Sequence, residues 1–260
     1  MEPKNILILL LIVIAGVFHA FWFATERRRR QPHGPLKPSP LALGIAFVAN
    51  FFDTLGIGSF ATTTSMSKLW GVMPDEKIPG TLNVGYVMAT VVQAVIFMTI
   101  IEVDFLTLIS IIGAAVLGAF LGAGVVAGFN RRQVQIGMGS ALLVASALMV
   151  LSMSGRGPAP GEALGLTGAK LGIAVGISMV LGALMMLGIG FYGPCMIMIS
   201  LLGMDPRVSY PIMMGACAFL MPSGSIQFVR KGSYDLRTAI AFLIAGPLAV
   251  LIAAPLVDAI

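Results

Sequence analysis

One carboxylate lies deep in an apolar run of this sequence, just before a glycine-rich stretch. It belongs to Asp53, and its charge is costly to bury in a membrane unless it is paired, hydrated or protonated. Asp53 is therefore a candidate for proton coupling, with pairing to Lys68 or contact with water as the alternatives. The glycine-rich stretch, Leu-Gly-Ile-Gly at residues 55–58, is followed by a dense set of hydroxyl side chains. These are Ser59, Thr62, Thr63, Thr64 and Ser65.

The same four letters occur again at residues 187–190, an offset of 132 positions (187 minus 55). The offset also carries Gly44 onto Gly176 and Pro79 onto Pro211, without a gap. Glycines and prolines that keep this register indicate an internal duplication. The residues after the second glycine-rich stretch include Tyr192, Gly193, Pro194 and Cys195, and the offset places Cys195 opposite Thr63.

Each glycine-rich stretch predicts a break in a membrane helix. A break exposes backbone N–H and C=O groups, which are tolerated only where protein or a water-filled cavity satisfies them. The helix that starts after the break presents free N–H groups and the positive end of its dipole, which suit an anion. The alternative is that the nearby hydroxyls only satisfy backbone carbonyls or pack helices. The predicted substrate-binding residues are Gly58, Ser59, Thr62, Thr63, Asn83, Gln93, Gly190, Tyr192 and Cys195.

A polar stripe marks the segment that follows the first break. Asn83, Tyr86, Thr90 and Gln93 have the spacing i, i+3, i+7 and i+10, which places them on one helical face. Four polar groups on an apolar helix predict the lining of a cavity, with interhelical hydrogen bonding as the alternative. In the second copy, Ser223, Ser225 and Gln227 occupy the corresponding region.

The elements that position these groups are predicted to be transmembrane helices. The 260-residue chain is 58% hydrophobic and 10% charged, whereas a soluble domain is about 45–50% apolar and about 25% charged. Several apolar runs are long enough to cross a bilayer, so we predict an all-α polytopic membrane protein with about eight transmembrane segments. The segments cover residues 5–24, 41–67, 79–101, 105–129, 134–151, 171–204, 208–229 and 239–257.

Residues 171–204 form an uncharged run that is too long for one straight span. Its 34 residues would extend about 51 Å as a helix, against a hydrocarbon core of about 30 Å. A break at residues 187–190, with Pro194 suited to a first helical turn, predicts a hairpin that enters and leaves on one side. A tilted or kinked span is the alternative, and residues 41–70 give the same prediction. Hairpins place 12 basic residues in the cytoplasm and 4 outside, whereas single crossings give 10 and 6, so the positive-inside rule favours hairpins.

These segments predict one membrane transporter domain over residues 1–260. It consists of an N-terminal helix and basic linker (1–40), a first repeat (41–151) and a second repeat (168–257). The two repeats would have opposite orientations, each with a glycine-broken re-entrant or hairpin helix. Inverted repeats of this kind are common in secondary transporters.

Other classes of function find little support in the sequence. There is no Ser-His-Asp set, phosphate-binding loop or carboxylate pair, so no enzyme is expected. Cys195 and Cys217 lie in apolar segments without metal-ligand spacing, and neither a metal nor a cofactor is expected. The net charge of +5 comes from basic residues at segment ends and requires no nucleic acid. The expected partners are a small anion, the lipid bilayer of the cell (plasma or inner) membrane and a second copy of the chain in a homodimer.

The two glycine-centred breaks and the turns that follow them resemble those of the TauE/SafE sulfite exporter family, also called the toluene-sulfonate uptake permease family. The matching turns are Gly-Val-Met-Pro at residues 71–74 and Gly-Met-Asp-Pro at residues 203–206, and Gly80-Thr81 is similar to the pair that begins the next family helix. The resemblance covers residues 41–257. One departure is that Ser59 and Phe191 stand where family members usually continue with glycines.

The resemblance implies a multi-pass carrier for sulfite, sulfonates or related sulfur-containing anions. Together with the breaks, it gives the leading hypothesis of a secondary transporter that works by alternating access, with proton coupling through Asp53. The alternatives are a non-transporting membrane scaffold and a channel for small solutes.

Overall fold

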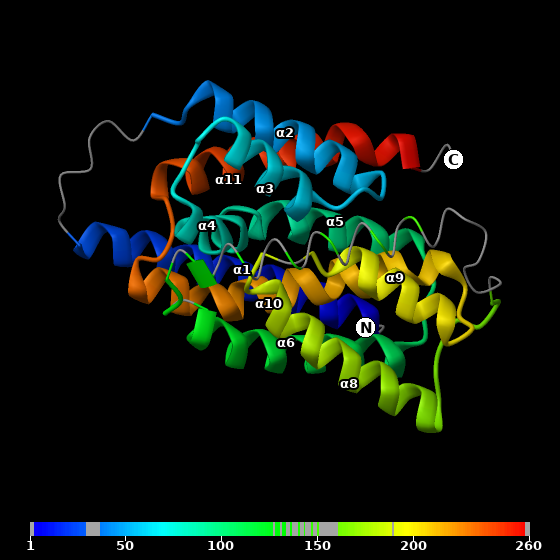
Figure 1. Cartoon of the computed structure of the whole chain (residues 1–260). Helices are drawn as coiled ribbons and strands as arrows, with labels where there is room; N and C mark the ends of the chain where they lie inside the picture. Colours follow the sequence, from blue (N-terminus) through cyan, green and yellow to red (C-terminus); the bar gives the residue numbers. More distant parts are fainter. Residues whose placement is uncertain are drawn as a thin grey trace.

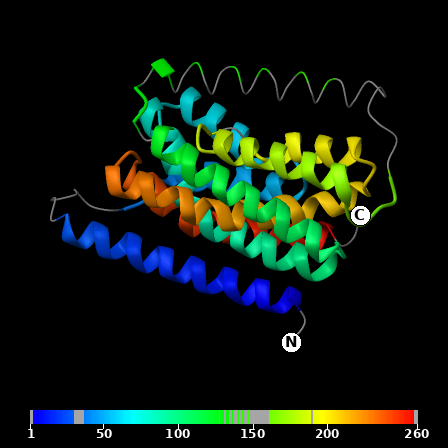
Figure 2. The ribbon, with the colours of Figure 1, turned by 90° about the horizontal axis from the view of Figure 1, so that it is seen from below.

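The described helices lie side by side in an elongated bundle (Figure 1; Figure 2). The computed structural model describes residues 3–29, 37–126, 128–130, 161–188 and 190–257, with scattered positions between 132 and 150. Its α-helices are α1 (Pro3–Arg28), α2 (Pro40–Thr54), α3 (Ser59–Leu69), α4 (Ile78–Gly85), α5 (Val87–Ile100), α6 (Phe105–Val126), α8 (Gly168–Met185), α9 (Tyr192–Leu201), α10 (Ser209–Lys231) and α11 (Leu236–Val257), with short 3-10 helices η1 (Asp75–Lys77) and η3 (Pro206–Val208).

The lengths and hydropathies of these helices are those of a polytopic membrane protein. Within the described residues, five helices are long and apolar enough to cross a membrane, and the bent pair of α4 and α5 makes a sixth if it is one span. The all-α, multi-pass class predicted from the sequence is therefore confirmed. The expected segment 134–151 lies almost entirely outside the described residues, and the number of eight segments stays a prediction.

Both predicted helix breaks are present. α2 ends at Thr54 and α3 begins at Ser59, which leaves residues 55–58 as the first break. α8 ends at Met185 and α9 begins at Tyr192, so the second break lies between these two residues. Gly56 and Gly58 have φ values of 106° and 68°, a left-handed conformation that glycine adopts without the strain of a side chain.

The chain reverses direction at each break, so the two broken segments are hairpins. In the second hairpin, Lys170 Nζ at the start of α8 donates to Leu202 O, just past the end of α9, at 3.0 Å. In Figure 1, α2 and α3 also run in opposite directions, and their outer ends lie at the end of the bundle where α1 terminates. The second hairpin opens toward the other end of the bundle (Figure 1).

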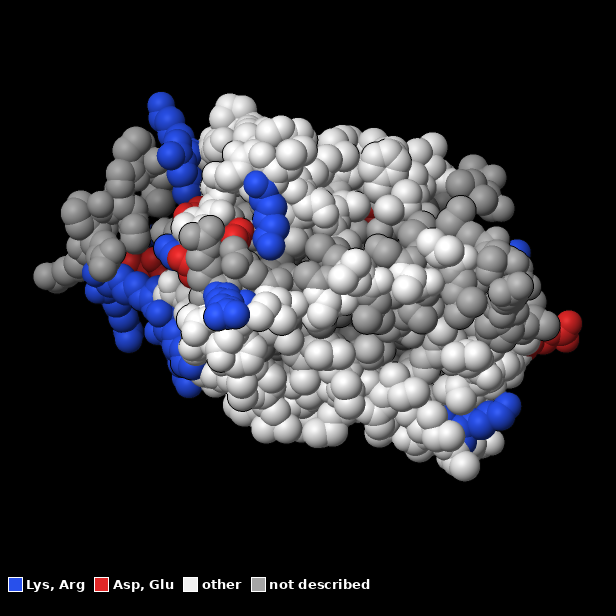
Figure 3. All heavy atoms as spheres, in the orientation of Figure 1, with Lys and Arg blue, Asp and Glu red and all other residues white. Residues whose placement is uncertain are grey.

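The charge distribution distinguishes the two ends. Lys and Arg gather at the end where α1 terminates, and fewer appear at the opposite end (Figure 3). At the basic end, Trp22 Nε1 donates to the Tyr234 hydroxyl at 2.9 Å, and that hydroxyl donates to Glu26 Oε1 at 2.5 Å. Arg29 pairs with Glu26 at 2.7 Å and donates to the Arg230 carbonyl at 3.0 Å. This network ties α1 to the turn between α10 and α11.

Small residues allow the second hairpin to pack closely on α6. A Cβ on Gly118 would lie 1.8 Å from the Met179 carbonyl oxygen, and one on Gly182 would lie 2.1 Å from the Ala115 carbonyl oxygen. Backbones can approach this closely only where a side chain is absent, as is common between membrane helices. The contact holds α8 closely against α6.

The predicted span 79–101 is not one straight helix. α4 and α5 meet at Tyr86 with a bend of 43°. Gly85 lies directly against α11, since a Cβ there would be 2.8 Å from Phe242 Cβ. The Tyr86 ring stacks on Phe242 at a centroid distance of 4.6 Å. The bend therefore occurs where α11 packs closely against the junction of α4 and α5. Because of the bend, the polar side chains of α4 and those of α5 point in different directions.

Candidate functional site

The two breaks face each other inside the bundle. A Cβ on Gly56, in the first break, would lie 2.8 Å from the hydroxyl oxygen of Tyr192 and 3.2 Å from that of Tyr210. A Cβ on Gly190, in the second break, would lie 3.7 Å from Phe60 Cβ. The start of α3 and the start of α9 thus meet in one region, so predicted substrate-binding residues from the two breaks lie near each other.

Asp53 bridges the first break. Its Oδ1 accepts a hydrogen bond from the backbone N–H of Ser59, the first residue of α3, at 2.6 Å. Its Oδ2 accepts from Gln93 Nε2 of α5 at 2.9 Å. The side chain is 5% exposed, and no cation pairs with it in the described part of the chain. A carboxylate at a helix N-terminus is stabilised by the dipole and the N–H group.

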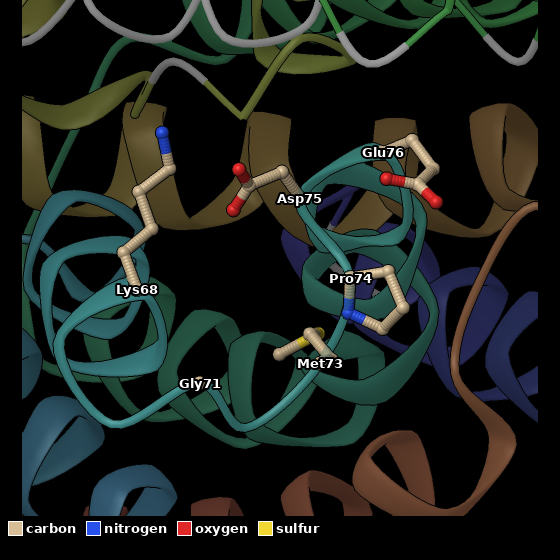
Figure 4. Close-up of a pocket in the computed structure, with 6 residues that line it drawn as sticks. All are labelled: Lys68, Gly71, Met73, Pro74, Asp75 and Glu76. Carbon is tan, nitrogen blue, oxygen red and sulfur yellow. The ribbon is translucent and has the colours of Figure 1, made fainter.

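The alternative pairing of Asp53 with Lys68 is wrong. Asp53 contacts the first turn of α3, whereas Lys68 lies nine residues further on, about 13 Å along the helix. Lys68 instead lines a surface pocket of about 400 Å³ with Asp75 and Glu76 (Figure 4). This pocket lies beyond the C-terminal end of α3, on the segment that connects it to η1.

Of the hydroxyls behind the first break, those of Thr62, Thr63 and Ser65 make hydrogen bonds within the protein, whereas Thr64 Oγ1 is buried without a partner among the described residues. Thr62 Oγ1 donates to the carbonyls of Gly58 at 3.1 Å and Ser59 at 2.9 Å. Thr63 Oγ1 lies 2.8 Å from the Tyr86 hydroxyl, and both side chains are buried. These contacts match the alternative in which hydroxyls satisfy carbonyls and pack helices. Their role toward a substrate stays a prediction.

The polar stripe reaches both breaks. Gln93 lies at the first, where its Nε2 also donates to Thr54 Oγ1 at 3.1 Å. Asn83 lies at the second, where its Nδ2 is 3.3 Å from the Met185 carbonyl oxygen. The bend at Tyr86 separates the two amides, which are both fully buried. The stripe therefore connects the two hairpins.

The surroundings of the second break are rich in sulfur. Cys217 Sγ of α10 lies 3.7 Å from Met185 Sδ at the end of α8, and Cys195 of α9 is fully buried. In the described residues, no three His, Cys, Asp or Glu side chains come together in a group that could hold a metal ion. Tyr192 of the second hairpin faces Gly56, which follows Asp53 by three residues in the first break. The groups of both hairpins thus form one cluster.

Several buried polar atoms of this cluster have no hydrogen-bond partner of normal geometry among the described residues. They are Asn50 Oδ1, Asn83 Oδ1, Gln93 Oε1, Tyr192 OH and Ser225 Oγ. Buried polar groups are usually satisfied, so such a concentration makes this cluster a candidate place for water or a ligand to bind.

The structure adds residues to the site that the sequence did not single out. Tyr210 faces Tyr192 with ring centroids 6.2 Å apart, and Met185 contacts both Asn83 and Cys217. The offset of 132 could have identified Met185, because it pairs this residue with Asp53. No signal in the sequence marked Tyr210.

The described helices, with two broken hairpins that meet at buried polar groups, are those of a multi-pass membrane protein with a candidate site between the breaks. A family model described as "Sulfite exporter TauE/SafE" matches residues 3–149, more than half of the chain. The chain belongs to this family of membrane transporters. The match includes the first span, which the resemblance did not cover, and ends before the second break. Neither the comparison with curated proteins nor that with solved structures gave a match.

Proposed function

We propose that the protein is a secondary transporter for sulfite, sulfonates or related small sulfur-containing anions. The observation that carries the proposal is the meeting of the two breaks, where Gly56 faces Tyr192. A re-entrant helix that begins inside the membrane presents its free backbone N–H groups to an anion at that depth. Family membership supports sulfite and related anions as the substrate class.

Transport would use alternating access between two inverted halves, residues 41–151 and 168–257. Support comes from the opposite directions of the hairpins, one opening at each end of the bundle (Figure 1). Motion of one half against the other would expose the central site to each side in turn. The bilayer would be the cell's plasma or inner membrane.

Asp53 would couple transport to protons. An ionised carboxylate repels an anion that binds nearby, and protonation removes this repulsion. Because Asp53 has no cationic partner in the described residues, a proton is the simplest means of neutralising it. Anion and proton would then bind cooperatively, which is the thermodynamic basis of symport.

The decisive experiment measures uptake of labelled sulfite into proteoliposomes that contain the purified protein, with and without a proton gradient. Protein-free liposomes and the Asp53→Asn variant are the controls. We expect saturable uptake with counterflow, accelerated by the gradient in the wild type only. Flux that does not saturate and shows no counterflow would instead indicate a channel. The absence of flux for sulfite, thiosulfate and a panel of sulfonates would overturn the proposal and favour the scaffold.

A further inference from the structure

The end of α1 and the end of α10 meet at the basic end of the bundle, although they are 200 residues apart in the sequence. Arg29, just past the end of α1, donates through Nη2 to the carbonyl oxygens of Val229 and Arg230, the second of these at 3.0 Å. A Cβ on Gly232, where α10 turns toward α11, would lie 3.5 Å from Arg29 Nη1. Arg29 therefore brings two runs of basic residues, one from each helix, to a single place.

Four basic side chains of these two runs are exposed on the surface of the protein. They are Arg27 and Arg28 of α1, and Arg230 and Lys231 of α10. Lys231 Nζ donates to the Gly124 carbonyl oxygen of α6 at 2.9 Å, a neutral partner that leaves its charge uncompensated. Within the described ranges, no carboxylate forms an ion pair with any of the four. The junction of α1 and α10 thus carries an excess of positive charge, at the end of the bundle where Lys and Arg gather (Figure 3).

The carboxylates of the adjoining segments are already engaged in the fold. Glu26 Oε1 accepts from Arg29 at 2.7 Å and from the Tyr234 hydroxyl at 2.5 Å. Asp235 Oδ1 accepts from the backbone N–H of Thr238 at 2.9 Å, as an acidic residue commonly does at the start of a helix. The natural counter-charge for the four exposed cations therefore comes from outside the chain.

The junction lies at the depth where membrane lipids carry their phosphates. The helices that end there, α1 and α10, are both long and apolar enough to cross a membrane. On α1, Phe23 is 43% exposed and lies one turn before Arg27, and the exposed Ala24 lies one turn before Arg28. An exposed apolar surface that ends in guanidinium groups matches an acyl chain that ends in a phosphate. A free phosphate ion would contact only the charged part of this surface.

We propose that an anionic phospholipid of the surrounding bilayer binds at the junction of α1 and α10. Its phosphate is held by the four exposed cations, and an acyl chain runs along α1 past Phe23. Clusters of Lys and Arg at the ends of membrane helices attract anionic lipids, and guanidinium groups bind phosphate oxygens in a bidentate manner. The bound lipid strengthens the attachment of α1 to the turn between α10 and α11. This inference does not depend on what the protein transports.

The test compares the melting temperature of the intact protein in nanodiscs of phosphatidylcholine with that in nanodiscs of equal parts phosphatidylcholine and phosphatidylglycerol. Titration of the protein in neutral detergent with short-chain phosphatidylglycerol, followed by the rise in melting temperature, gives an apparent Kd. The triple variant Arg27→Gln/Arg28→Gln/Arg230→Gln removes three exposed charges and keeps Arg29 and Lys231, which make hydrogen bonds within the fold. The variant Lys4→Gln/Lys170→Gln/Arg207→Gln removes three basic charges from the opposite end and is the charge-matched control.

We expect phosphatidylglycerol to raise the melting temperature of the wild type and of the control variant. The triple variant should bind phosphatidylglycerol about tenfold or more weakly, because each cation adds to the attraction. The variant Arg27→Lys/Arg28→Lys/Arg230→Lys keeps the charges and should retain most of the affinity. Equal melting temperatures of the wild type in the two bilayers would overturn the proposal, as would wild-type affinity in the triple variant or an equal loss in the control. Inorganic phosphate that stabilised the protein as well as phosphatidylglycerol does, at the same concentration, would overturn the assignment to a lipid.

Discussion

Replacement of Asp53 by asparagine tests whether the central carboxylate controls anion binding. The substitution preserves shape and can preserve hydrogen bonding. The new amide oxygen can accept from Ser59 N, and the new amide nitrogen can donate to Gln93 Oε1, which has no partner in the described residues, if the Gln93 amide turns over. We therefore expect a folded protein in which only the charge is lost.

The magnitude follows from the position of the carboxylate. Asp53 bonds the first residue of α3, and Gly56, three residues after Asp53, faces Tyr192, the first residue of α9. If the anion binds about 8 Å from Asp53, the effective dielectric constant of about 20 that suits such sites gives a repulsion of about 2 kcal/mol between the anion and the ionised carboxylate. This energy corresponds to a roughly 30-fold difference in affinity between the ionised and protonated protein.

The assay is equilibrium binding of ethanesulfonate, whose charge is constant over the range tested, to purified protein at a series of pH values. In the wild type, we expect affinity to rise by up to about 30-fold as the pH falls and Asp53 takes up its proton. Asp53→Asn should bind with the higher affinity at every pH. Glu102→Gln, which removes an exposed charge from the turn before α6, should keep the wild-type profile. A variant Asp53→Asn that retained the wild-type pH dependence would refute the reasoning.

Three further substitutions test the fold around the site. Gly56→Ala places a methyl group 2.8 Å from the Tyr192 hydroxyl at a φ of 106°. We therefore expect the free energy of unfolding to fall by about 1–3 kcal/mol and sulfite flux to be impaired. Wild-type flux and stability would contradict this geometry. Gly118→Ala should lower the melting temperature, whereas Gly113→Ala, with open space around it, should not; equal effects would argue against close packing of α6 on α8. Tyr234→Phe removes the hydroxyl that joins α1 to the α10–α11 turn, and should lower the free energy of unfolding by about 1–3 kcal/mol, measured by thermal unfolding. An unchanged unfolding curve would show that this network does not stabilise the fold.

The positions of the breaks could be predicted because they depend on local chemistry. Glycine repeated at residues 56, 58, 188 and 190 loosens any helix, and an uncharged run of 34 residues cannot cross a bilayer once without extreme tilt. The hairpin geometry also followed from the distribution of basic residues. Both inferences use properties that each segment has by itself.

The partners of Asp53 and the bend at Tyr86 could not be predicted, because they depend on distant residues. Gln93 lies 40 positions from Asp53, and only the packing of α5 beside the first break brings the two together. The bend lies where α11 packs against Gly85, and this contact joins residues that are far apart in the sequence. Sequence spacing placed Asn83 and Gln93 on one face, but the bend directs them to different hairpins. The limits of the two repeats remain predictions.

The hairpin architecture has an electrical consequence. α9 has 10 residues and is about 15 Å long, roughly half of the hydrocarbon thickness, so the central site would feel only part of the transmembrane voltage. A unit charge that crosses half of a 100 mV potential changes energy by about 1 kcal/mol. A monoanion that travels with one proton on Asp53 carries no net charge and would be insensitive to voltage. The same anion moving alone would be driven out of a cell whose interior is negative, so the protonation of one carboxylate would decide whether voltage acts on transport.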